Sequence, residues 1–172
     1  DRTSRGLGDV YKRQISFHNA PFFHVAGSQL DYSVLVKGGT VLRHRQFDAE
    51  RAAHALQDLG VTSAFFVPSM INAVLQVPEI SSLDFSKLRL IEYGAAPMPQ
   101  AQLRAAIDVF GCSFVQLFGA GTEGGMQAIL PAEDHIVGGT DVQTRRLSSI
   151  GRPTAFTEVR VINEDGVPVS PG

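Results

Sequence analysis

The sequence predicts an α/β fold, with a mainly parallel sheet, helices on both faces and the start of a separate β-rich subdomain. Short apolar segments alternate with segments of helical periodicity, which favours repeated strand–helix–strand units. Residues 61–67 form a near-continuous apolar run, which is typical of a strand buried on both faces. Beyond residue 150, polar and apolar residues alternate, which indicates a half-exposed antiparallel hairpin.

A strand and a helix are expected first. Residues 15–23 are apolar and extended, and Pro21 limits this strand to a sheet edge or a strand end. Apolar residues at helical spacing predict a helix over residues 25–36. Gly38 and Gly39 follow it and should end the helix.

A short strand, a helix and the buried strand are expected next. The short strand covers residues 40–42. Asp48 is a suitable N-cap for a helix over residues 49–59, and Gly60 is its expected C′ residue. The apolar run 61–67 is the buried strand.

Two more helices and one strand complete the regular alternation. Pro68 opens a helix over residues 69–76, and a strand over residues 88–93 follows. Pro99 lies near the first position of a helix over residues 100–110. The last strands expected in the body are residues 113–118 and 126–130.

The chain is divided into three parts on this basis. Residues 1–14 have no helical or strand period and are interpreted as a non-native or disordered leader. Residues 15–149 are expected to form a partial α/β domain. Residues 150–172 are expected to be the truncated start of the β-rich subdomain.

Composition limits the function classes. The 172 residues are 44 % hydrophobic and 19 % charged, as in globular proteins. A net charge of −2 without a basic stripe argues against a nucleic-acid partner. The single cysteine, Cys112, can form no internal disulfide and is expected to pack at a strand start. No apolar run reaches the roughly 18 residues of a transmembrane segment, and no secretory signal is recognised, so we expect a cytoplasmic location.

The most informative segment is the glycine-rich run of residues 115–125. Gly119, Gly121 and Gly124 match the dinucleotide fingerprint G-x-G-x-x-G. That fingerprint requires a helix after the third glycine, and Pro131 comes too soon for one. The residues alone leave two other interpretations, a plain glycine-rich loop or a nucleotide site in which a carboxylate binds Mg²⁺.

Two loops are expected to share one crevice. Residues 93–97 and 118–123 each follow a strand of the predicted parallel sheet. Ligands of open parallel sheets bind outside the carboxyl ends of the strands. Both loops should therefore face the same ligand.

Five short segments, in order, resemble the acyl-adenylate-forming (AMP-binding) superfamily. They are residues 21–27 (Pro-Phe-Phe-His-Val-Ala-Gly), 67–70 (Val-Pro-Ser-Met), 93–99 (Tyr-Gly-Ala-Ala-Pro-Met-Pro), 116–125 and 149–153 (Ser-Ile-Gly-Arg-Pro). The chain is most similar to an internal fragment of an acyl-CoA synthetase. The resemblance implies a ligase that uses ATP, Mg²⁺ and a carboxylic acid to form an acyl-adenylate and passes the acyl group to coenzyme A. The fragment by itself is expected to be inactive.

The resemblance implies residue-level roles. The residues expected to bind ATP or AMP are Gly94, Ala95, Ala96, Pro97, Phe118, Gly119 and Thr122. The residues expected to act in catalysis are His24, Thr122 and Glu123.

Each of these roles has a chemical reason. Residues 94–97 resemble the backbone wall beside the adenine, and Phe118 resembles the aromatic residue on its other face. Thr122 resembles the hydroxyl at the α-phosphate, and Glu123 resembles the Mg²⁺ ligand. His24 resembles the histidine at the entrance of the acyl pocket, although the residue pattern alone also allows a histidine hydrogen-bonded at a strand end.

The glycine-rich run departs from the family spacing, which is aromatic-Gly-x-Thr-Glu. One additional residue stands between Phe118 and Glu123. Either Gly121 is an insertion, or Ala120 replaces the family glycine.

Two other functions remain open. One is an adenylation domain that loads a carrier protein, and the other is a non-catalytic nucleotide-binding module. The acyl chain, the thiol acceptor and the oligomeric state are also open.

Polar residues elsewhere are expected to have no special role. His18 is expected to be incidental and His54 solvated. Asp134 and His135 resemble a pair at similar positions of acyl-CoA ligases, and a plain loop is an equally open interpretation. Arg145 and Arg146 are expected to be an exposed charge pair.

Overall fold

The structure, a computed structural model, describes residues 14–119 and 124–169. All but the last residue of the expected leader lies outside these ranges. Ala120, Gly121, Thr122 and Glu123 also lie outside them, so the roles given to Thr122 and Glu123 remain predictions.

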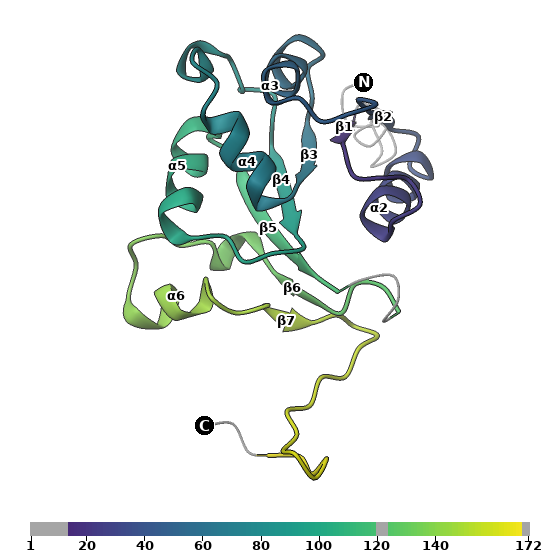
Figure 1. Cartoon of the computed structure of the whole chain (residues 1–172), viewed down its shortest axis with the longest axis vertical. Helices are drawn as coiled ribbons and strands as arrows, with labels where there is room; N and C mark the ends of the chain where they lie inside the picture. The colour runs from purple at the N-terminus through teal and green to yellow at the C-terminus, as the bar shows by residue number, and fades with distance from the viewer. Residues whose placement is uncertain (1–13, 120–123, 170–172) are drawn as a thin grey trace, which may run out of the picture.

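The described residues form a seven-stranded sheet of order β2-β1-β3-β4-β5-β6-β7 (Figure 1). β1 to β5 pair in parallel, and β6 and β7 add antiparallel strands at one edge. The strands are β1 Ile15–His18, β2 Thr40–Leu42, β3 Ser63–Phe66, β4 Leu90–Gly94, β5 Ser113–Phe118, β6 Ala128–Leu130 and β7 Arg152–Pro153. The prediction of a mainly parallel sheet is confirmed.

Helices cover both faces of the sheet. The α-helices are α2 Val25–Leu35, α3 Ala49–Asp58, α4 Pro68–Leu75, α5 Gln100–Phe110 and α6 Asp141–Arg146. Two short 3₁₀ helices are η1 Ile80–Ser82 and η3 Ala132–Asp134. In Figure 1, α3, α4 and α5 stand together, whereas α2 lies beside β1 and β2.

The two faces of β3 divide the core. Phe66 is buried in the large cluster that α3, α4 and α5 form with the sheet, together with Leu56 and Leu103. Phe65, its neighbour, belongs instead to a small cluster with Leu30 of α2. Successive side chains of a strand point to opposite faces, so a wholly buried strand must have helices on both sides.

Local signals set most of the boundaries. The Asp48 side chain accepts a hydrogen bond from the Arg51 amide at 2.8 Å, as an N-cap residue should. Gly60 follows α3 with φ of 61°, in the left-handed region that favours glycine. The strand expected over 15–23 was too long, because it ends at His18 and the chain then turns into α2.

Among the α-helices of the described residues, α6 was not predicted. α6 begins with a capping box, in which the Thr140 side chain accepts from the Gln143 amide and the Gln143 side chain accepts from the Thr140 amide. This Thr-x-x-Gln pattern is visible in the sequence and could have indicated the helix. The helix is short and has no buried residue, so apolar periodicity gave no signal.

The C-terminal residues begin within the main sheet. β7 pairs with β6 although it lies past residue 150. Further on, an antiparallel bridge joins Ile162 to Pro168 around a turn held by the Asn163 side chain, which accepts from the amides of Asp165 and Val167. In Figure 1 this part of the chain extends away from the sheet. Its assignment to a separate subdomain remains a prediction.

None of the described helices is both long and apolar enough to cross a membrane.

Candidate functional site

Two cavities open where β4 and β5 end. The first, of about 340 Å³, is lined by Ala95, Ala96 and Pro97, by residues 116–119 and by residues 147–150. The second, of about 240 Å³, is lined by His24, Leu30, Phe65, Gly94 and Met126, among others. Ala95, Leu117 and Gly119 line both cavities and form the wall between them. The structure therefore brings together the residues that the sequence placed at two strand ends.

The loop after β4 is held in an unusual conformation. A Cβ atom on Gly94 would lie 2.4 Å from the Leu117 carbonyl oxygen, so the two strands approach closely only because residue 94 is glycine. Ala95 has φ of 69°, a conformation that costs about 1–3 kcal/mol in a residue other than glycine. Ala95, Ala96 and Pro97 are exposed and line the first cavity. A flat ligand could thus lie against them.

Phe118 and Gly119 form another part of the first cavity. The Phe118 side chain is 42 % exposed, although it lies in a strand of the sheet. Its carbonyl accepts from the Gln127 amide at 2.8 Å, which ties β5 to β6. Gly119 has φ of 123°, and a Cβ atom there would lie 2.4 Å from the Gly125 carbonyl oxygen. Only glycine fits this position, and the aromatic ring is available to a ligand.

His24 lines the second cavity and is the N-cap residue of α2. Its Nδ1 accepts a hydrogen bond from the Ala26 amide at 3.2 Å. When the ring is neutral, its proton must then be on Nε2, which can donate a hydrogen bond. The residue is exposed and is not part of a strand.

A buried polar cluster that the sequence did not predict underlies the first cavity. The Tyr93 hydroxyl lies 3.2 Å from Gln116 Oε1 and 3.1 Å from His135 Nε2. His135 Nδ1 donates to the Pro131 carbonyl at 2.9 Å. Burial raises the pKa of Tyr93 to about 12 and lowers the pKa of His135 below its ordinary value. Both groups are therefore neutral near pH 7.

Tertiary contacts bury Asp134 and His135 at the end of η3, which the sequence did not indicate. Asp134 is 6 % exposed and accepts from Arg146 at 2.9 Å and from Arg152 at 3.1 Å. Arg146 is exposed, as expected, with its side chain 50 % accessible, and it is in addition a partner of the buried Asp134 carboxylate. These contacts attach α6 and β7 to η3, beside residues 147–150 of the cavity wall.

Two other histidines also differ from expectation. His18 is 1 % exposed and hydrogen-bonded within the fold, so it is not incidental. His54 is only partly solvated, since its Nε2 lies 3.1 Å from Glu79 Oε1. Glu50, His54 and Glu79 offer ligand atoms within 4.8 Å of one another. They line neither cavity, and exposed acidic groups of this kind are common without an ion, so we assign them no metal.

Comparison with protein families gives one match that spans most of the chain. The family model described as AMP-binding enzyme matches residues 3–172. The fatty acid–[acyl-carrier-protein] ligase ScoC of Streptomyces coeruleorubidus is 32 % identical over 158 residues, which are 92 % of this chain and 30 % of that protein. The feruloyl-CoA synthase of an Amycolatopsis species is 35 % identical over 154 residues, 89 % of this chain and 30 % of that protein.

A third relative is the medium/long-chain-fatty-acid–CoA ligase FadD8 of Mycobacterium tuberculosis, 32 % identical over 152 residues, which are 88 % of this chain and 25 % of that protein. The chain thus spans 25–30 % of the length of these curated relatives.

Solved structures share the fold. The N-terminal domain of FACL13 from Mycobacterium tuberculosis superposes with a TM-score of 0.76 and 30 % identity, covering 91 % of this chain and 38 % of that one. The amide bond synthetase McbA from Marinactinospora thermotolerans gives a TM-score of 0.77 and 26 % identity, covering 92 % of this chain and 31 % of that one.

Proposed function

Since the chain belongs to the AMP-binding enzyme family, we propose that it is part of an ATP-dependent acid–thiol ligase, an AMP-forming acyl-CoA synthetase. The observation that carries the proposal is the pair of cavities that share the wall of Ala95, Leu117 and Gly119. A ligase of this kind must hold a nucleotide and a carboxylic acid side by side, because a bond forms between them. Two adjoining cavities at the carboxyl ends of parallel strands suit that requirement.

The first cavity is assigned to the nucleotide. An adenine ring is flat and can approach the exposed backbone of residues 95–97, while Phe118 supplies an aromatic face for stacking. The volume of about 340 Å³ lies at the small end of the range for ligand pockets, about 300–1,000 Å³. The small side chains and the exposed ring both fit a purine base.

The second cavity is assigned to the carboxylic acid. Its described lining includes the apolar side chains of Leu30, Phe65 and Met126, which suit an acyl or aryl group. His24 lines the same cavity, and its Nε2–H can donate a hydrogen bond to the substrate carboxylate. In this arrangement the carboxylate of the acid points toward His24 and its acyl or aryl group lies among the apolar side chains.

The reaction has two steps. A carboxylate oxygen attacks the α-phosphorus of ATP, and the bond to the β-phosphate oxygen breaks, which gives acyl-adenylate and pyrophosphate. A thiol sulfur then attacks the acyl carbon and loses its proton, and AMP leaves with the electron pair of the broken C–O bond. Thr122 and Glu123 are proposed to contact the α-phosphate and Mg²⁺, respectively, and Mg²⁺ would neutralise phosphate charge. A cytoplasmic location is part of this proposal.

The thiol acceptor defines a second candidate function. The relative ScoC is named a fatty acid–[acyl-carrier-protein] ligase and is 32 % identical to this chain. A carrier-protein thiol is therefore a reasonable alternative to coenzyme A. Supplying each acceptor to the adenylated enzyme and measuring AMP release separates the two functions.

The proposal is tested by acid-dependent ATP–pyrophosphate exchange with the full-length protein that contains this chain. A panel of medium-chain, long-chain and aryl carboxylic acids is supplied. We expect exchange with at least one acid, and a loss of about 100-fold or more in Glu123→Gln, because a metal contact is removed. Glu133→Gln, at an exposed site in η3, is the matched control. No exchange with any acid would contradict the ligase, and a normal rate in Glu123→Gln would contradict the role of Glu123.

A further inference from the structure

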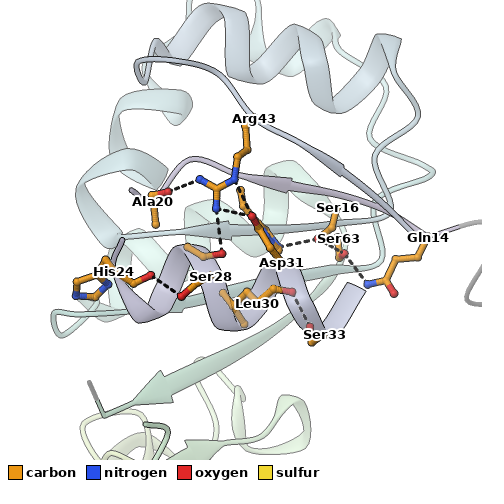
Figure 2. Close-up of polar contacts among 12 residues, drawn as sticks. Gln14, Ser16, Ala20, His24, Ser28, Leu30, Asp31, Ser33, Arg43 and Ser63 are labelled. Carbon is orange, nitrogen blue, oxygen red and sulfur yellow. Dashed lines mark hydrogen bonds and ion pairs between the residues drawn. The ribbon is translucent and has the colours of Figure 1, made fainter. Parts of the chain in front are cut away.

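Arg43 joins three points of the chain that lie before and after His24 in the sequence (Figure 2). This residue directly follows β2. Its Nη1 donates to the Ala20 carbonyl, and its Nη2 donates to the Gly27 carbonyl at 2.9 Å. Its Nε and Nη2 lie 2.8 and 2.7 Å from Asp31 Oδ2. One planar guanidinium thus binds the start of the β1–α2 loop, the first turn of α2 and the following turn.

The segment enclosed by these contacts is folded tightly. The His24 amide donates to the Pro21 carbonyl at 3.0 Å. A Cβ atom on Gly27 would lie 2.1 Å from the Pro21 carbonyl oxygen, so the loop rests directly on the helix. The Arg43 guanidinium carbon also lies 5.6 Å from the centre of the Phe22 ring, within cation–π range. The position of His24 therefore depends on how this loop is held against α2.

The buried Asp31 carboxylate holds the Arg43 guanidinium in place. This residue is 4 % exposed, and its Oδ1 accepts from His18 Nδ1 at 2.7 Å. Burial lowers the pKa of His18 below its ordinary value, so the histidine contributes a hydrogen bond and not a charge near pH 7. Arg43 is consequently the positive partner of a buried carboxylate, and its removal would leave that carboxylate without a compensating charge.

The same cluster continues into the sheet but does not form a nucleophile. His18 Nε2 lies 2.8 Å from Ser16 Oγ, so serine, histidine and aspartate stand in the order of a hydrolase triad. Ser16 is only 1 % exposed, however, and its Oγ is also 2.8 Å from Ser63 Oγ. No substrate carbonyl can reach that oxygen. The chain of hydrogen bonds anchors Asp31 to β1 and β3.

We propose that Arg43 is a positioning residue that sets the carboxylate end of the second cavity by holding the loop that carries His24. This inference rests on the proposed function, since it assigns that cavity to the carboxylic acid. It requires arginine specifically, because lysine can neutralise Asp31 but cannot reach two carbonyl oxygens and a carboxylate with one planar group. Arg43 lines neither cavity itself, so its effect must pass through the loop.

The experiment compares Arg43→Lys and Arg43→Gln with Arg45→Lys in the full-length protein. Arg45 is exposed and lies two residues further along the same segment, which makes it a matched control. In both Arg43 variants we expect KM for the carboxylic acid to rise about 10-fold or more, while KM for ATP changes less than about two-fold. Equal rises in both KM values, or no rise in either, would overturn the proposal. So would an equal effect of Arg45→Lys.

Hydrogen exchange supplies a readout that needs no activity. Amides of residues 19–28 are expected to exchange about 10-fold faster in the Arg43 variants, whereas those of α5 stay unchanged. Unchanged exchange in residues 19–28 would overturn the proposal even if KM rose. If the wild-type protein activates no acid, the proposed function fails, and hydrogen exchange still decides whether Arg43 holds the loop.

Discussion

Replacing Tyr93 by phenylalanine tests whether the polar cluster beneath the first cavity stabilises the protein. The change removes one oxygen atom and leaves the ring, which is 1 % exposed and stacks edge-to-face on Phe114 with centroids 6.5 Å apart. The hydroxyl has two acceptors in reach, Gln116 Oε1 at 3.2 Å and His135 Nε2 at 3.1 Å. His135 Nε2 is an acceptor because Nδ1 donates its proton to the Pro131 carbonyl.

The magnitude follows from what is left behind. A buried acceptor that loses its donor costs about 1–3 kcal/mol, because it was withdrawn from water and gains nothing in return. Gln116 and His135 are 9 % and 8 % exposed, so water cannot readily replace the hydroxyl. The edge-to-face ring contact is retained. We therefore expect Tyr93→Phe to lower the free energy of unfolding by about 1–3 kcal/mol.

Urea unfolding followed by circular dichroism measures this change, since the sequence contains no tryptophan for fluorescence. Tyr32→Phe removes the same atom from a side chain that is 60 % exposed, and we expect it to change stability by less than about 0.5 kcal/mol. A loss in Tyr93→Phe no larger than in this control would refute the reasoning. It would mean that the cluster contributes no net stability.

Two further predictions concern titration. Burial raises the pKa of the Cys112 thiol to about 12, so little reactive thiolate is present at pH 8. Iodoacetamide at pH 8 should therefore label the folded protein about 100-fold more slowly than the protein in urea. Equal labelling rates would contradict this burial. Burial lowers the pKa of His18 and His135 below the ordinary 6.5. The unfolded chain therefore binds protons at a higher pH than the folded protein does, and the free energy of unfolding should fall as the pH drops below about 6.5. Burial raises the pKa of Glu92, which makes the protein more stable as the pH falls and would mask the histidine effect. Tm is therefore measured in Glu92→Gln. A constant Tm between about pH 7.5 and 5.5 in this variant would be evidence against the histidine effect.

Regular elements were predictable because their signals are local. The strand at Ser113–Phe118 and the helix at Gln100–Phe110 were predicted to the residue. Apolar periodicity, an opening proline and a closing glycine all lie within a few positions of each boundary. The prediction over residues 15–23 was too long because an apolar stretch continues past the last paired residue, and only pairing with a neighbour ends a strand.

The candidate site was predictable to the level of its strand ends. Residues 95–97 and Phe118 line the first cavity, and Gly94 lines the adjoining one, as a parallel sheet requires of loops at neighbouring carboxyl ends. His24 lines the adjoining cavity, although it caps a helix and does not end a strand. The roles of Thr122 and Glu123 stay predictions.

The sequence by itself determined the alternation of strands and helices and the strand-end loops that line the two cavities. It could do so because burial and turn formation depend on residues within short stretches of the chain. The tertiary structure alone decided which polar groups meet. Arg43 binds Asp31 from 12 residues away, and Tyr93 meets His135 across 42 residues. A buried polar group needs a hydrogen-bond partner to offset its lost hydration. The residues next to it in the sequence do not indicate which distant residue supplies that partner. Only the folded sheet brings these partners within hydrogen-bonding distance.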